Sequence, residues 1–227
     1  MNADLKAAVK INSLAGKVRP FDLMMDLITR YGHWAFVIYG LLLWFTPGKT
    51  REDRRNACVS AFIGVCIASL ISYAIGRVWK RERPFRESPQ IWNFTGHRAN
   101  ASFPSNHTMN GCVVAMELLR HNTKGSKLMA VLAGILAFSR VFAGMHYPSD
   151  VLGGAAIAAI VHKAVHMPAV SALTGALAAF GSAVVVYYNT SDAVSVIDAI
   201  FESCSAFGTV GLSVGVTGQL NTGAKIL

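Results

Sequence analysis

Long apolar runs separated by short polar or basic segments constrain the fold of this chain more than any other feature. A helix needs about 20 apolar residues to cross the roughly 30 Å hydrocarbon core of a bilayer, and it satisfies its own backbone hydrogen bonds there. The sequence therefore predicts an all-α, polytopic membrane bundle of about six spans. The predicted spans cover residues 34–45 (with a start near Met24), 57–78, 109–119, 128–143, 151–165 and 169–188.

The composition agrees with lipid as the solvent for much of the chain. Of the 227 residues, 53% are hydrophobic and 15% are charged, and the mean hydropathy is +0.42. Soluble domains carry about 25% charged residues. The formal net charge is +9, but the basic residues lie in short loops between the apolar runs, which is typical of segments beside anionic membrane surfaces. We therefore expect the membrane as a partner, and no nucleic acid.

The order of the runs predicts which polar segments share one face of the membrane. Residues 3–31 mix charged and apolar positions, which favours short amphipathic helices at the interface. With alternating spans, segments 79–104 and 143–149 lie on one face, and segments 48–56 and 120–127 lie on the other. Both faces carry Lys and Arg, so the positive-inside rule leaves the orientation open.

The first of these faces holds the side chains best suited to chemistry. Ionisable residues stand beside apolar runs in three segments, GRVWKRERPF, ASFPSNHT and SRVFAGMHYPSD, and such residues usually mark a functional site. Arg83 and Arg140 each present a planar fork of donors that matches phosphate oxygens. Ser105 and Asn106 precede an apolar helix, whose first backbone N–H groups are unpaired and attract anions. The segments therefore indicate a phosphate site.

Two histidines supply the remaining groups for phosphoryl transfer. His146 and Asp150 are four residues apart, so they share a face wherever this turn is helical. A carboxylate that holds one imidazole nitrogen leaves the other nitrogen free to attack phosphorus. His107 lies just inside the predicted helix, where it is placed to protonate the leaving group. We expect His146 as the nucleophile, Asp150 as its partner and His107 as the acid, with no metal and no cofactor.

The three segments in this order also carry a family resemblance. Arg-Pro, then Pro-Ser-x-His, then Ser-Arg-x5-His-x3-Asp resemble the signature of the type 2 phosphatidic acid phosphatase superfamily, over about residues 77–154. The resemblance implies a phosphohistidine at His146, with Asp150 as its partner and His107 as the acid. The phosphate ligands that it implies are Arg83, Ser105 and Arg140.

Within the superfamily, the patterns RPF, H-x4-SFPSxHT and SR-x5-HYPxDVLGG are most similar to the bacitracin-resistance type of undecaprenyl-diphosphatase. The resemblance implies a polyprenyl diphosphate lipid as substrate, hydrolysed to the monophosphate at the extracytoplasmic face of the bacterial plasma membrane. Phosphatidic acid and phosphatidylglycerol phosphate are alternative substrates, and a phosphotransferase would use the same phosphohistidine. His97 matches a histidine of this branch, for which a loop hydrogen bond and a catalytic role are both open.

Two positions depart from the superfamily pattern. That pattern has a lysine seven residues before Arg83, where this chain has Gly76. Arg77 and Lys80 are the candidates to replace this phosphate-binding cation. Asn106 stands where many relatives have glycine, and we expect its backbone N–H to bind phosphate in the same way.

The C-terminal part does not fit a lipid phosphatase. Within residues 195–219, the pattern SAFGTVGLSVG resembles one pore-loop repeat of the Trk and Ktr potassium transporters, in which backbone carbonyls replace the hydration shell of an ion. A working filter needs several such repeats around one axis, and this chain has one. We predict a lipid phosphatase domain at residues 1–168 and a fused or truncated fragment at 169–227. A potassium-transport component is the alternative of another functional class.

Overall fold

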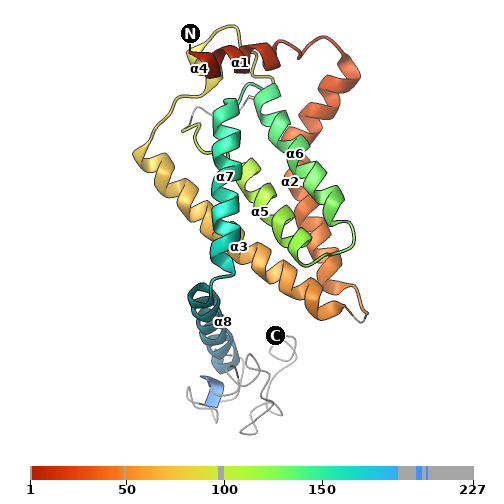
Figure 1. The fold of residues 1–227 in the computed structure, drawn as a ribbon, viewed down its shortest axis with the longest axis vertical. Coiled ribbons are helices and arrows are strands. Elements are labelled where there is room, and N and C mark those ends of the chain that lie inside the picture. Colours follow the sequence, from red (N-terminus) through yellow and green to blue (C-terminus); the bar gives the residue numbers. More distant parts are fainter. Residues whose placement is uncertain (1, 49, 97–99, 189–197, 201–202, 204–227) are drawn as a thin grey trace. The chain divides into compact units, whose positions relative to one another are not determined.

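The computed structural model describes residues 2–48, 50–96, 100–188, 198–200 and 203 (Figure 1). It divides into two units, Met1–Val165 and His166–Leu227. The described residues form eight helices and no strand, so the predicted all-α class is confirmed. His97 lies outside the described residues, and so does the pore-loop-like segment 195–219 apart from residues 198–200 and 203.

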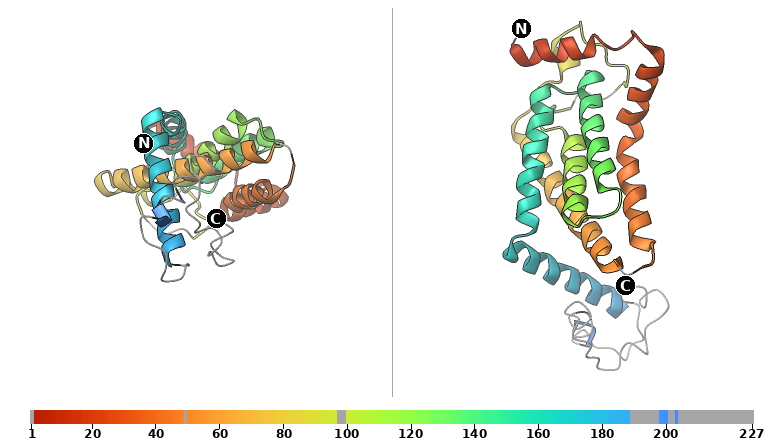
Figure 2. Two further views of the ribbon diagram at one scale, coloured as in Figure 1. Left: turned by 90° about the horizontal axis from the view of Figure 1, so that it is seen from below. Right: turned by 45° about the vertical axis from the view of Figure 1, so that its right-hand side comes forward.

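The first unit is a bundle built around helix α5 (Asn106–Arg120). Helices α3 (Arg51–Val78), α6 (Ser126–Phe142) and α7 (Pro148–Val165) pack against α5, and α2 (Arg19–Phe45) packs along α6 (Figures 1 and 2). One buried apolar cluster joins α2, α3, α5 and α6, and a second joins α3, α5 and α7. These apolar contacts hold the helices of the first unit together.

Two short helices lie at one end of this bundle. Helix α1 (Ala3–Asn12) is capped by the Asn2 side chain, which accepts a hydrogen bond from the backbone N–H of Leu5 at 2.8 Å. It contacts α6 and α7 and lies across the end of the bundle (Figure 1). Helix α4 (Pro84–Glu87) belongs to the long segment between α3 and α5. The loop before α7 opens at this same end, so polar segments far apart in the sequence meet there.

The helices match the predicted apolar runs, with differences at two starts. Helix α2 begins at Arg19 rather than near Met24, with Pro20 in its first turn, where proline is well tolerated. Residues 19–31 are therefore part of one long helix, and α1 is the short N-terminal amphipathic helix. Helix α3 begins at Arg51, inside the predicted loop, and two acidic side chains in its first turn complement the helix dipole.

The outer surface of the first unit is strongly apolar. Among the described residues, α3 is the one helix long and apolar enough to cross a membrane, with a mean hydropathy of 2.2 in its best 18-residue window. Phe45 of α2, Phe62 of α3 and Leu152 of α7 point outward and are each about 70% exposed. Apolar outer faces on neighbouring helices are unfavourable in water and are expected where helices face lipid.

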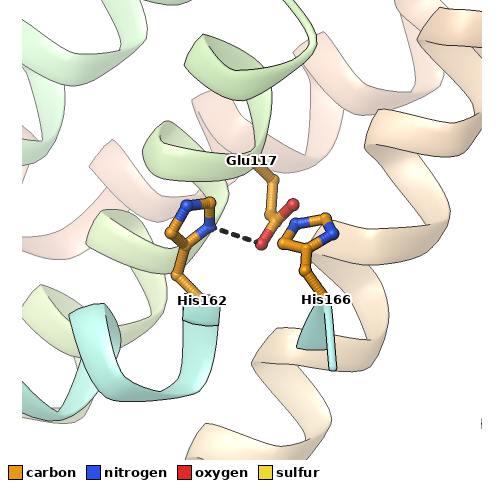
Figure 3. A group of neighbouring side chains, drawn as sticks. All are labelled: Glu117, His162 and His166. Carbon is orange, nitrogen blue, oxygen red and sulfur yellow. Dashed lines mark hydrogen bonds and ion pairs between the residues drawn. The ribbon is translucent and has the colours of Figure 1, made fainter. Parts of the chain in front are cut away.

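A buried carboxylate of α5 pairs with a histidine of α7. Glu117 of α5 is fully buried, and its carboxylate lies 2.8 Å from Nδ1 of His162 on α7 (Figure 3). A carboxylate among apolar side chains is costly unless it is paired and hydrogen-bonded. The pair therefore favours one register of α7 against α5.

The described part of the second unit is mainly helix α8 (Pro168–Tyr188). This helix coincides with the sixth predicted apolar run. The predicted domain boundary after residue 168, and the interpretation of the remainder as a fused or truncated fragment, stay predictions.

Candidate active site

One cavity in the first unit brings together six of the predicted site residues, among them two arginines and two histidines that face one another across it. It has a volume of about 360 Å³, and its walls include the guanidinium groups of Arg83 and Arg140 and the imidazoles of His107 and His146. Arg83 precedes α4, His107 lies in the first turn of α5, Arg140 lies in the last turn of α6 and His146 lies in the loop before α7. Helix packing therefore assembles side chains that are up to 63 residues apart.

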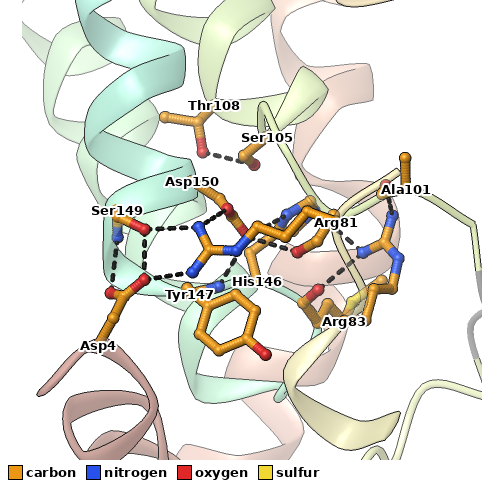
Figure 4. Close-up of polar contacts among 12 residues, drawn as sticks. Asp4, Arg81, Arg83, Ala101, Ser105, Thr108, His146, Tyr147, Ser149 and Asp150 are labelled. Atoms are coloured by element: carbon orange, nitrogen blue, oxygen red, sulfur yellow. Dashed lines mark hydrogen bonds and ion pairs between the residues drawn. The ribbon is translucent and has the colours of Figure 1, made fainter. Parts of the chain in front are cut away.

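Arg83 is held in place by fixed acceptors. Its side chain is buried, and Nε and Nη2 donate to Oδ1 of Asn100 at 2.9 and 2.7 Å. Its Nη1 donates to the backbone carbonyl of Met145 at 2.8 Å and lies 3.2 Å from Nε2 of His146 (Figure 4). Burial lowers the pKa of Arg83 to about 10, so the guanidinium is charged at neutral pH. This arrangement is suited to hold a phosphate oxygen beside Nε2 of His146.

His146 is buried, and its other nitrogen faces Asp150. Nδ1 lies 3.5 Å from Oδ2 of Asp150, which is longer than a normal hydrogen bond. Oδ2 also accepts hydrogen bonds from the hydroxyl of Ser102 and, at 2.9 Å, from the backbone N–H of Tyr147. Burial lowers the pKa of His146 to about 4, against the opposing effect of Asp150. The imidazole is therefore neutral at physiological pH, the state in which it acts as a nucleophile.

Arg81 completes this network, although none of the sequence patterns predicts a role for it. Its Nη1 donates to Oδ1 of Asp150 at 2.6 Å and to the hydroxyl of Ser149 at 2.7 Å, and its Nη2 pairs with Asp4 of α1 at 2.6 Å (Figure 4). The guanidinium lies over the Tyr147 ring, 3.9 Å from its centroid. The sequence signal was an additional cation in KRERPF, but the sequence does not show which of these cations points inward.

Arg140 faces the cavity from the end of α6. Its side chain is buried, and Nη1 donates to the backbone carbonyl of Thr29 at 2.8 Å. The hydroxyl of Thr29 donates in turn to the backbone carbonyl of Ser139 at 3.1 Å, so α2 and α6 are linked beside the site. Nε of Arg140 is buried and has no hydrogen-bond partner among the described residues. A donor is thus available for a phosphate oxygen.

The start of α5 forms another wall of the cavity. Asn106 and His107 line it, as their predicted roles require. Ser105 is fully buried and points elsewhere, because its hydroxyl lies 3.0 Å from that of Thr108 and its backbone N–H donates to the carbonyl of Asp150 at 3.1 Å (Figure 4). Its role as a phosphate ligand stays a prediction. In this structure Ser105 connects the start of α5 to α7.

The two candidates for the missing lysine lie in different places. Arg77 is exposed and lines the cavity next to Gly76, with its guanidinium 5.8 Å from the centroid of the Tyr73 ring. Lys80 is also exposed, but it lines a neighbouring cavity with Arg81. Of the two cations, Arg77 is therefore the one beside the phosphate-sized space.

Comparison with known proteins identifies the family. The pattern of the PAP2 superfamily matches residues 57–170, which include the two arginines and the two histidines that converge on the cavity. The chain belongs to the PAP2 superfamily. The resemblance drawn from the three segments is thereby confirmed, and the chain is a PAP2-type phosphatase of membrane lipids.

Two relatives and one solved structure show how similar this chain is to individual known proteins. Undecaprenyl-diphosphatase BcrC of Bacillus subtilis is 30% identical over 151 residues, which cover 66% of this chain and 76% of that protein. The putative undecaprenyl-diphosphatase YbjG of Escherichia coli is 35% identical over 130 residues, covering 57% of this chain and 61% of that protein. The first transmembrane PAP2 type phosphatidylglycerolphosphate phosphatase from Bacillus subtilis has a similar crystal structure, with a TM-score of 0.53 and 24% identity, over 73% of this chain and 85% of that chain. The PAP2 superfamily fold thus agrees with the bundle described above.

Proposed function

We propose that this chain hydrolyses undecaprenyl diphosphate to undecaprenyl phosphate and inorganic phosphate through a phosphohistidine intermediate. The observation that carries the proposal is the convergence of Arg83, His107, Arg140 and His146 on one cavity. Phosphoryl transfer depends on positioning and on charge stabilisation. Two guanidinium groups meet the charge of a terminal phosphate, and two imidazoles divide nucleophilic attack from proton transfer. The relatives BcrC and YbjG favour a polyprenyl diphosphate among the lipid phosphates.

In the first half of the reaction, Arg83 and Arg140 bind oxygens of the terminal phosphate. Nε2 of His146 forms a bond to phosphorus while the bond from phosphorus to the bridging oxygen breaks. His107 donates a proton to the departing lipid monophosphate. Asp150 stabilises the positive charge that develops on the imidazole of His146.

In the second half, water attacks the phosphohistidine. His107, now neutral, accepts a proton from this water while the bond between phosphorus and Nε2 of His146 breaks. Inorganic phosphate leaves, and His146 returns to its neutral state. No step of this route calls for a metal ion, because the guanidinium groups supply the positive charge. A lipid hydroxyl in place of water would give phosphotransfer from the same intermediate.

We place the protein in the plasma membrane of a bacterium, as a multi-pass protein with the cavity on the extracytoplasmic face. The apolar outer faces of α2, α3 and α7 support insertion in lipid. The polar segments that form the cavity lie at one end of the bundle, where the head group of a lipid would meet them.

The test is phosphate release from undecaprenyl diphosphate in detergent with EDTA present. We expect release by the wild type and by the control Lys127→Ala, an exposed residue in the first turn of α6, and none by His146→Ala. Phosphate release that is unaffected by His146→Ala would overturn the catalytic assignment. Faster release from phosphatidic acid or phosphatidylglycerol phosphate than from undecaprenyl diphosphate would overturn the substrate assignment.

A further inference from the structure

A third histidine, His33 of α2, lies beside the predicted catalytic pair. Its ring contacts the ring of His107 edge to face, with 5.2 Å between the centroids and 79° between the planes. It follows Thr29, the residue whose carbonyl holds Arg140, by one helical turn. Nδ1 of His33 is buried and has no hydrogen-bond partner among the described residues. None of the three segments selected from the sequence includes this residue.

His33 stands between the phosphate cavity and an apolar groove. His33 and His107 line a second cavity of about 220 Å³, and this cavity shares Asn106 and His107 with the phosphate cavity. Beyond it, an apolar groove of about 470 Å³ runs between α2, α3 and α5. The second cavity and the groove share the walls Phe36, Val37, Val65 and Val114. The phosphate cavity, the His33 cavity and the groove therefore follow one another in space.

The in-line geometry of phosphoryl transfer relates the order of these three cavities to the parts of the substrate. The leaving group departs roughly in line with the attacking atom, so a leaving group protonated by His107 lies on the side of the cavity away from His146. For a lipid diphosphate, that leaving group is a lipid monophosphate, which carries negative charge and an apolar chain. For a lipid monophosphate, the leaving group is an uncharged alcohol. A donor next to His107 thus binds a phosphate oxygen in the first case alone.

We propose that His33 binds the phosphate group that leaves with the lipid, with the polyprenyl chain in the groove beyond it. This contact makes the site prefer lipid diphosphates over lipid monophosphates. The inference rests on the proposed function of the same cavity, since it takes His107 as the acid on the leaving-group side. His33 is then a specificity-determining residue for this reaction.

The first test compares two substrates in the full chain carrying His33→Phe, which keeps an aromatic ring in contact with His107 and removes the polar nitrogens. We expect kcat/KM for undecaprenyl diphosphate to fall about ten- to hundred-fold, the value of a hydrogen bond to a charged group. The value for phosphatidic acid stays unchanged. Tyr31→Phe, an exposed position on the same helix, is the control and changes neither value. An equal loss with both substrates, or no loss with either, would overturn the inference.

The second test separates the two phosphate subsites by inhibition. Undecaprenyl phosphate, the product that keeps the leaving phosphate, should inhibit His33→Phe about tenfold more weakly than the wild type. Orthovanadate, which occupies the terminal-phosphate subsite at Arg83 and Arg140, should inhibit both proteins equally. Equal changes for the two inhibitors, or no change for undecaprenyl phosphate, would contradict the proposed contact.

The failure of this inference is distinguishable from failure of the proposed function. A wild type that releases phosphate from phosphatidic acid but not from undecaprenyl diphosphate overturns the proposed substrate, and the inference falls with it. A wild type that hydrolyses undecaprenyl diphosphate, with an unchanged substrate ratio in His33→Phe, overturns the inference alone.

Discussion

At the scale of the residue, Asp150 shows how one buried carboxylate holds an imidazole and a guanidinium group at once. Its Oδ2 faces the imidazole of His146 and accepts hydrogen bonds from Ser102 and Tyr147, while its Oδ1 accepts from Arg81. A fully buried carboxylate is unfavourable unless its oxygens are paired. Arg81 supplies that pairing from a side away from the cavity and so holds the carboxylate in line with His146.

This arrangement predicts a catalytic effect at Arg81, which lies outside the cavity. We expect Arg81→Ala to lower kcat/KM about tenfold or more, because Asp150 loses a charge-assisted hydrogen bond and its position against His146. The Tm in detergent falls as well, since Asp4 of α1 loses the same partner. Arg86→Ala, an exposed neighbour in the same segment, is the control. Wild-type kinetics in Arg81→Ala would show that the other contacts of Asp150 are sufficient.

At the scale of the element, polar side chains fix the helices against one another. Asn12 at the end of α1 donates to the backbone carbonyls of Trp92 and Phe142 at 3.0 and 2.8 Å and accepts from the N–H of Trp92. Thr29 links α2 to α6 beside the cavity. A shifted register would leave these buried donors and acceptors unsatisfied, at a cost of about 1–3 kcal/mol for each group. The geometry of the cavity therefore depends on contacts outside it.

The buried pair of Glu117 and His162 allows a test of this idea. We expect His162→Leu to destabilise the bundle by about 3 kcal/mol, because the carboxylate of Glu117 stays buried with one partner fewer. Glu117→Gln in the same chain should restore part of the stability, since an uncharged amide is less costly to bury. The measurement is thermal unfolding in detergent, with KM for the lipid substrate as a check on the cavity. Equal Tm values for His162→Leu and the wild type would show that the pair is dispensable.

At the scale of the whole molecule, the first unit contains all the residues that line the cavity. It also has buried apolar clusters of its own, which is the property of a domain able to fold independently. The second unit supplies none of the side chains used in the proposed reaction.

We therefore expect a chain that ends after Val165 to release phosphate with the kcat/KM of the full chain. The physical reason is that the described residues lining the cavity all lie within residues 1–165. The measurement is phosphate release by the purified truncated protein, with His146→Ala in the same truncated chain as the control. A truncated protein that is folded by circular dichroism but inactive would show that the second unit takes part in the reaction.

The alternative function of residues 169–227, potassium transport, has a separate test. The measurement is whether the full chain restores growth of a potassium-uptake-deficient strain, and we expect no rescue.

Helix positions were largely predictable because their signal is local. An apolar run of sufficient length predicts a helix wherever it occurs, and α3, α6, α7 and α8 coincide closely with their runs. The starts of α2 and α3 were placed too late, because a first turn of charged residues or proline continues a helix without adding to its hydropathy. The predicted convergence of two arginines and two histidines followed from the types of residue and their order.

The sequence by itself determined the helical class, the family and the residue types at the cavity. Helix length, apolar composition and motif spacing are local features that can be read directly from the order of the residues. Only the tertiary structure decided which side chains face the cavity. It turns Arg81 toward Asp150, directs the Ser105 hydroxyl to Thr108, leaves Lys80 outside, and sets His33 against His107. These directions depend on how helices distant in sequence pack and rotate against one another, and no local pattern specifies that rotation.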